Sequence, residues 1–162
     1  MTFWKDKNPY MKENRLPDVV AAITALANYR YYKLSYEACA ERIQNYPEKA
    51  EHWKKVLKEH PEFFRVSEKT ASLVWRRQMP KRFDVKTSEE ITRQAYEKLS
   101  SAEKAEISRR PLLAAETTAL IDTAIKLHER AIEQSNQSLW RHPLFLVVIG
   151  FSGAFAGSFL GG

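Results

Sequence analysis

Hydrophobic residues recur at helical spacing in three successive stretches of the first sixty residues, and polar residues separate them. The spacing predicts a helix over 17–33, a second beginning after Ser35, which can cap it, and a third over 47–60 that ends before Pro61. The apolar faces of these helices are formed by Val19, Ile23, Leu26, Tyr36, Cys39, Ile43, Trp53, Val56 and Leu57.

The pattern changes from helical to extended after residue 61. Residues 63–66 and 71–76 are rich in β-branched and aromatic types, and the polar residues 67–70 between them suit a hairpin connection. Trp53 and Trp75 each lie on the apolar face of their predicted element, so we predict that both are in the core. Three short helices therefore lead into one β-hairpin.

This order of elements resembles that of a winged-helix domain, in which three helices are followed by a two-stranded wing. The resemblance covers about residues 17–78 and rests on the order and length of the elements, without a diagnostic motif. We predict a winged-helix-like domain over 17–86, preceded by a flexible basic and aromatic arm over 1–16. The resemblance implies a nucleic-acid-binding role for the third helix.

The segment 87–139 is predicted to be a helical connector. Thr87 with Glu90, and Ser100 with Glu103, have the spacing of a capping box, in which a hydroxyl and a carboxylate each accept a hydrogen bond from a backbone N–H. A long amphipathic helix follows and is predicted to end near residue 133.

Residues 143–162 contain no charged side chain, and twenty such residues in a helix match a hydrocarbon core of about 30 Å. Trp140 and Arg141 stand where an amphipathic ring and a cation favour the membrane interface. Residues 140–162 are therefore predicted to be a single-pass tail anchor in membrane lipid, with the N-terminal domain in the cytoplasm. A buried helix of a larger complex is the alternative.

Gly153, Gly157 and Gly161 are spaced by four, so they would share one helix face. The pattern resembles a glycine zipper, which implies homo-oligomerisation through close backbone approach in lipid. A passive anchor and a pore both fit this pattern. The predicted fold class is thus mainly α: a winged-helix-like head, a helical connector and one C-terminal transmembrane helix.

Charge is concentrated in the first half of the chain. Residues 1–87 carry 18 Lys and Arg against 11 Asp and Glu, whereas the whole chain has a net charge of +6. A basic region favours nucleic acid, anionic lipid or an acidic protein surface. The candidate contacts are Lys54, Lys55, Lys58, Arg76, Arg77, Lys81 and Arg82.

Residues that would form a catalytic or metal site are not grouped in the sequence. The four histidines have no partner at a metal-ligand spacing, Cys39 is the one cysteine, and no glycine precedes Gly150 to form a phosphate loop. We expect neither cofactor nor enzymatic activity. The predicted function is a membrane-tethered binding or adaptor module for a protein partner, similar in layout to bacterial accessory or defence-type membrane effectors. The alternative is a membrane-bound DNA-binding regulator.

Overall fold

The computed structural model describes residues 8–140, with side chains up to residue 136. The chain divides into two units, and their described residues are 13–125 in one and 8–12 together with 126–140 in the other. The described part of the latter comprises the 3₁₀-helix η1 (Pro9–Met11) and the C-terminal part of helix α7 (Ala114–Trp140). Both β-sheets belong to residues 13–125.

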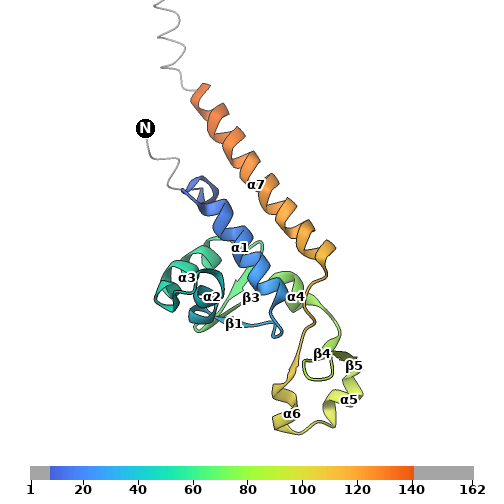
Figure 1. Cartoon of the computed structure of the whole chain (residues 1–162). Helices are drawn as coiled ribbons and strands as arrows, with labels where there is room; N and C mark the ends of the chain where they lie inside the picture. The colour runs from blue at the N-terminus through green and yellow to red at the C-terminus, as the bar shows by residue number, and fades with distance from the viewer. Residues whose placement is uncertain (1–7, 141–162) are drawn as a thin grey trace, which may run out of the picture. The chain divides into compact units, whose positions relative to one another are not determined.

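Four α-helices, one 3₁₀-helix and a three-stranded sheet make up the first part of the unit 13–125 (Figure 1). The elements in chain order are α1 (Arg15–Asn28), β1 (Leu34–Ser35), α2 (Tyr36–Gln44), η2 (Pro47–Lys49), α3 (Ala50–Glu59), β2 (Phe64–Val66), β3 (Thr70–Leu73) and α4 (Val74–Gln78). Strand β3 lies between β1 and β2 in an antiparallel sheet, where Ala71 pairs with Leu34 on one side and Val66 on the other. The three predicted helices and the predicted hairpin are present.

The core of this part is apolar and closely packed. Trp53, Val56 and Leu57 of α3 are fully buried, together with Ile23 of α1. The prediction for Trp53 is confirmed, whereas Trp75 is 39% exposed and its predicted place in the core is wrong. The further buried apolar residues include Val19, Leu26, Leu34, Cys39, Phe63, Phe64 and Leu73.

Two element boundaries differ from the prediction. Helix α1 ends at Asn28, although the spacing predicted helix to residue 33, because the carbonyl oxygen of Leu26 accepts a hydrogen bond from Arg76 Nη1 at 2.7 Å. The predicted strand 71–76 stops at Leu73, and the chain turns into α4 from Val74, whose N–H still donates to Phe63 O at 2.8 Å in continuation of the hairpin ladder. Arg76 is therefore on a helix beside the end of α1.

A second antiparallel sheet follows, and the sequence did not predict it. Strand β4 (Arg82–Asp84) lies between β5 (Glu89–Ile91) and β6 (Ile107–Ser108), and the short helices α5 (Arg93–Glu97) and α6 (Ser101–Ala105) connect β5 to β6. Figure 1 shows these elements as a small lobe of their own. The predicted connector is thus only partly helical.

The two predicted capping boxes have opposite outcomes. At Ser100 the box forms: its hydroxyl accepts from the N–H of Glu103 at 3.3 Å, and the carboxylate of Glu103 accepts from the N–H of Ser100 at 2.8 Å. At Thr87 no helix begins, because Asp84 Oδ1 accepts from the N–H groups of Lys86 and Thr87 and holds them in the β4–β5 turn. Thr92 caps α5 instead.

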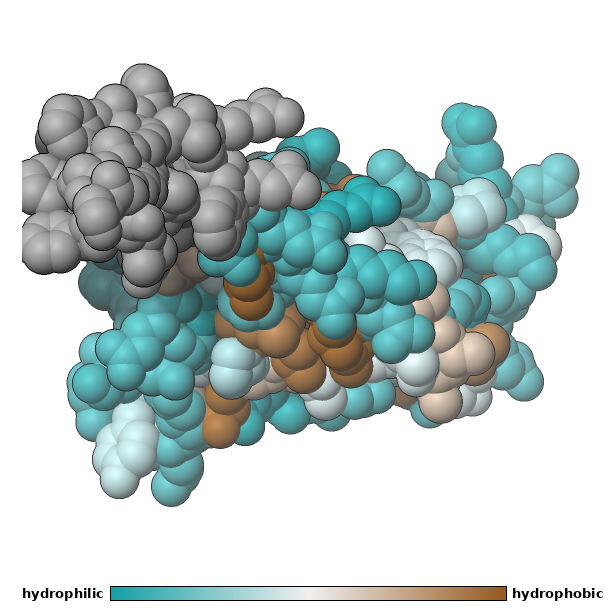
Figure 2. Space-filling model, turned by 90° about the horizontal axis from the view of Figure 1, so that it is seen from above, coloured by the Kyte–Doolittle hydropathy of each residue, from teal (hydrophilic) through white to brown (hydrophobic). Residues whose placement is uncertain are grey.

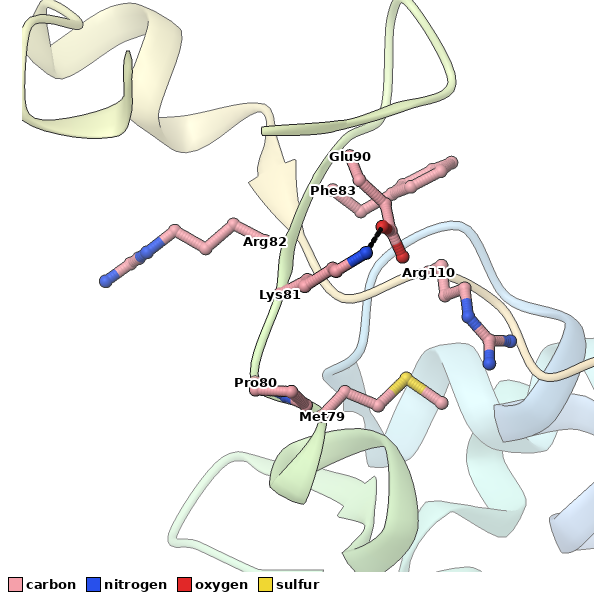
Figure 3. Close-up of a pocket in the computed structure, with 7 residues that line it drawn as sticks. All are labelled: Met79, Pro80, Lys81, Arg82, Phe83, Glu90 and Arg110. Atoms are coloured by element: carbon pink, nitrogen blue, oxygen red, sulfur yellow. Dashed lines mark hydrogen bonds and ion pairs between the residues drawn. The ribbon is translucent and has the colours of Figure 1, made fainter. Parts of the chain in front are cut away.

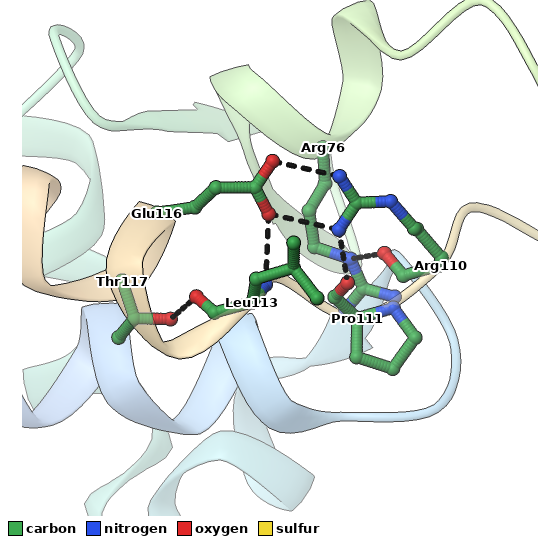
Figure 4. A network of polar contacts seen from close by, with 6 residues as sticks. All are labelled: Arg76, Arg110, Pro111, Leu113, Glu116 and Thr117. Atoms are coloured by element: carbon green, nitrogen blue, oxygen red, sulfur yellow. Dashed lines mark hydrogen bonds and ion pairs between the residues drawn. The ribbon is translucent and has the colours of Figure 1, made fainter.

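Helix α7 begins after an extended segment at residues 109–113 (Figure 4). Glu116 accepts hydrogen bonds from both terminal nitrogens of Arg110, at 2.7 and 2.8 Å, and from the N–H of Leu113 at 2.7 Å. These bonds satisfy an N–H of the first turn and place an acid at the positive end of the helix dipole. The helix then continues to Trp140, about seven residues beyond its predicted end.

On the face seen in Figure 2 the described surface is mainly hydrophilic, and hydrophobic side chains are visible near its centre and toward one edge. The exposed large apolar residues of the described chain are Tyr46, Val66, Trp75, Leu113, Ile125 and Ile132. Scattered apolar residues of this kind are usual on protein surfaces.

None of the helices within residues 8–140 combines the length and the hydrophobicity needed to cross a bilayer. Helix α7 is long, but Asp122, Lys126 and Glu129 give it charged positions along its length. This finding corrects the fold class with a C-terminal transmembrane helix, the tail anchor and the single-pass membrane localisation. The predicted span, 143–162, lies outside the described residues.

Candidate anion-binding site

Three arginines and two tyrosines line a hollow of about 340 Å³ at the second sheet. We call this hollow the arginine pocket, and its lining consists of Tyr32, Arg77, Arg82, Tyr96, Ile107, Ser108 and Arg109. These residues come from the loop after α1, from α4, β4 and α5, and from β6 and the residue that follows it. None of the seven is acidic.

Local contacts hold the arginines in place. The guanidinium carbon of Arg82 lies 3.5 Å from the centre of the Tyr96 ring, a cation–π arrangement that fixes the long side chain. Arg109 Nη1 donates to the carbonyl oxygen of Lys81 at 3.0 Å, which ties it to the start of β4. Arg77 is exposed. Within the described part of the chain, no ion pair involves any of these three arginines.

The loop that carries Tyr32 is bound directly to the second sheet. The N–H of Tyr32 donates to Ser108 Oγ at 2.8 Å, and the hydroxyl of Tyr31 donates to Glu106 Oε2 at 2.8 Å. The bond to Glu106 raises the pKa of Tyr31 above its ordinary value, because the carboxylate favours the protonated phenol. The two walls of the arginine pocket are therefore joined by hydrogen bonds.

Neighbouring hollows contain cations that are already paired. Lys81 Nζ lies 2.6 Å from Glu90 Oε2, and Arg93 Nε lies 2.8 Å from Glu97 Oε1. Figure 3 shows Lys81 and Glu90 joined on one side of β4, while the side chain of Arg82 extends away from them. The paired cations are partly neutralised by their acids, whereas the lining of the arginine pocket contains no acidic side chain.

Of the sequence-predicted contacts, the structure brings Arg77 and Arg82 together in the arginine pocket and places Lys81 beside it. The candidate contact Arg76 must be corrected. Its side chain is 0% exposed and donates to backbone carbonyls, which leaves it inaccessible to a phosphate. The sequence did not single out Arg109, Tyr32 or Tyr96 for this site.

The lysines of α3 lie apart from this site. Lys54 is partly engaged, with its Nζ 3.4 Å from Glu51 Oε1 and 5.6 Å from the centre of the Tyr36 ring. Lys55 and Lys58 are exposed on a helix that also presents Glu51. This face has mixed charge.

The remaining candidate residues give no second site in the described chain. Gly153, Gly157, Gly161 and Arg141 lie outside the described residues, and Trp140 is the last residue of α7. Burial raises the pKa of the Cys39 thiol to about 12, so it has little thiolate character at neutral pH. Within residues 8–140, no group of three or more His, Cys, Asp or Glu side chains is placed to hold a metal ion.

Comparisons with protein-family models, with curated proteins and with solved structures give no match, so inferences about function depend on the geometry described above.

Proposed function

We propose that this protein is a non-enzymatic binding module that takes the phosphates of a single-stranded nucleic acid in the arginine pocket. The observation that supports the proposal is a concave site with three arginines and no acid in its lining. Guanidinium groups form forked hydrogen bonds with phosphate oxygens, and neutralised phosphates release counterions, which favours binding.

The shape of the surface favours a flexible strand. The arginine pocket shares Arg82, Tyr96 and Arg109 with the neighbouring hollow, which is also lined by Lys81 and Arg93. The two hollows are therefore adjacent, although Glu97 also lines the second one and Lys81 and Arg93 are paired with acids. Proteins that bind single strands commonly use a basic groove that tracks the backbone, with aromatic side chains nearby.

The third helix gives weaker support for the alternative of duplex recognition. A recognition helix reads base edges with arginine, lysine, asparagine or glutamine. Helix α3 carries Lys54, Lys55 and Lys58 together with two acids, Glu51 and Glu59, which repel phosphates, and it has no arginine, asparagine or glutamine. Binding at the arginine pocket and binding at α3 thus predict different effects of substitutions on the affinity for nucleic acid.

A matched pair of variants separates them. Arg77→Gln/Arg82→Gln/Arg109→Gln removes three positive charges from the pocket, and Lys49→Gln/Lys55→Gln/Lys58→Gln removes three from the region of α3. Binding of a labelled single strand of about 12 nucleotides would be followed by fluorescence anisotropy between about 50 mM and about 200 mM salt. Three contacts predict a slope of log K against log salt of about −2, since each contributes about −0.7 for single strands.

We expect the slope to approach zero in the pocket variant and to stay near the wild-type value in the α3 variant. Loss of binding in the α3 variant alone would assign recognition to the helix and contradict the proposal. Binding of polyglutamate with no binding of oligonucleotide would assign the pocket to an acidic protein, which would also contradict it.

A further inference from the structure

The side chain of Arg76 is surrounded by backbone carbonyl groups and is completely buried. Its Nη1 donates to Leu26 O at 2.7 Å, Tyr29 O at 2.6 Å and Tyr31 O at 3.2 Å. Its other nitrogens donate to Arg109 O at 2.6 Å, Arg110 O at 3.0 Å and Arg30 O at 3.4 Å. One guanidinium therefore holds residues 26–31 and residues 109–110 together.

The segments that Arg76 joins are those that form the arginine pocket. Tyr32 follows the first segment directly, Arg109 belongs to the second, and Arg77 is the next residue along α4. Leu112 N–H also donates to Ala27 O at 3.0 Å across the same junction. The position of each pocket wall thus depends on the group between them.

We propose that Arg76 is a positioning residue that sets the spacing of Tyr32, Arg77 and Arg109 for the phosphate ligand. The inference rests on the proposed function. Arg76 itself does not touch the ligand, since its side chain is 0% exposed.

The chemistry of this site requires arginine. A guanidinium has five N–H donors in a planar fork, which can reach two chain segments at once, whereas a lysine ammonium is a compact charge with three donors. Burial, and to a lesser degree the charge of Arg110, lowers the pKa of Arg76 to about 10, so the group remains charged at neutral pH. A charged donor also forms stronger hydrogen bonds with the carbonyls than a neutral one does.

The test uses Arg76→Lys, with Arg65→Lys as a matched control because Arg65 is exposed on β2. Cooperative unfolding in urea establishes that each variant folds. In the folded Arg76→Lys variant we expect affinity for the single strand to fall on the order of tenfold and the salt slope to shrink by about 0.7, because one phosphate contact is lost. The control should match the wild type. An unchanged slope and affinity in folded Arg76→Lys would overturn the inference.

Hydrogen exchange gives a readout that needs no ligand. The amides of Tyr32 and Leu112 should exchange faster in Arg76→Lys, because their bonds to Ser108 and Ala27 span the loosened junction, while amides of α3 stay unchanged. Wild-type protein that binds no oligonucleotide would refute the proposed function, and unchanged exchange at both amides would separately refute the role of Arg76.

A second variant covers the case in which Arg76→Lys does not fold. Tyr31→Phe removes only the bond to Glu106 across the same junction. Like Arg76→Lys, this variant should speed hydrogen exchange of the Tyr32 amide and reduce the magnitude of the salt slope. If it does neither, the junction does not control the pocket, and the inference is wrong.

Discussion

Arg76 and Arg77 are adjacent in the sequence and lie in opposite environments. The first donates to carbonyls from two chain segments inside the protein, and the second is exposed at the edge of the arginine pocket. In the composition they count as two equal positive charges, but successive side chains on the helix α4 point in different directions. Charge alone therefore does not identify a binding residue, because its accessibility depends on the local fold.

The two tryptophans of the 13–125 unit should differ in their effect on stability. Trp53 is completely buried on α3, whereas Trp75 on α4 is 39% exposed. Trp53→Ala should lower the free energy of unfolding by about 3–5 kcal/mol through lost burial and a cavity, and Trp75→Ala by less than about 1 kcal/mol. Urea denaturation measures both. Equal losses would contradict the described packing.

At the scale of elements, the start of α7 depends on an ion pair. Glu116 accepts from Arg110 and from the N–H of Leu113, and these bonds hold its pKa below the ordinary value, with Arg110 as the largest cause. A lowered carboxylate pKa stabilises the fold above the unfolded-state value of about 4.3, and this contribution is lost as pH falls through the folded-state pKa.

The variant Glu116→Gln tests this pair through pH. At about pH 7 it should be less stable than the wild type by about 1 kcal/mol, because the pair is only partly shielded from solvent. Toward about pH 3 the difference should narrow, since the wild-type carboxylate loses charge as the pH falls toward its lowered pKa. Urea midpoints at both pH values measure the effect, and a constant difference would rule out the ionised pair as its source.

Elements whose signals are local could be predicted from the sequence. The hairpin of β2 and β3 follows from β-prone residues around a polar turn, and the box of Ser100 and Glu103 from a spacing of three. The second sheet could not be predicted, because β6 is only two residues long and pairs with a strand more than twenty residues earlier. Such pairing depends on tertiary contacts that no local pattern records. The Thr87 box failed for a different, local reason, since Asp84 accepts from the N–H groups of Lys86 and Thr87.

The candidate site shows the same limit. Arg77 and Arg82 were predicted from their basic surroundings, but Arg109 and Tyr32 come from segments separated by more than seventy residues. A signal for Tyr32 would have been the end of α1, which the periodicity placed five residues too late. The segment 143–162 shows a different limit, because its prediction as a membrane span depended only on the composition of the segment, which contains no charged side chain.

At the scale of the whole molecule, the net charge of +6 becomes informative only through its arrangement. Lys81, Arg93 and Arg110 have acidic partners, while the arginines of the pocket do not have one among the described residues. Arg77, Arg82 and Arg109 are thus three arginines without an acidic partner in the described chain that line one hollow beside the segments joined by Arg76. This arrangement is the basis for proposing a phosphate ligand.

The most direct test of this account maps where a single strand touches the protein. Full-length protein would be cross-linked by ultraviolet light to an oligonucleotide of about 12 nucleotides that carries photoreactive bases, and the linked peptides identified by mass spectrometry. The account predicts cross-links at Tyr32 and Tyr96, which line the arginine pocket, and their loss in Arg77→Gln/Arg82→Gln/Arg109→Gln. Cross-links confined to residues 50–59 of α3, unchanged in that variant, would contradict it.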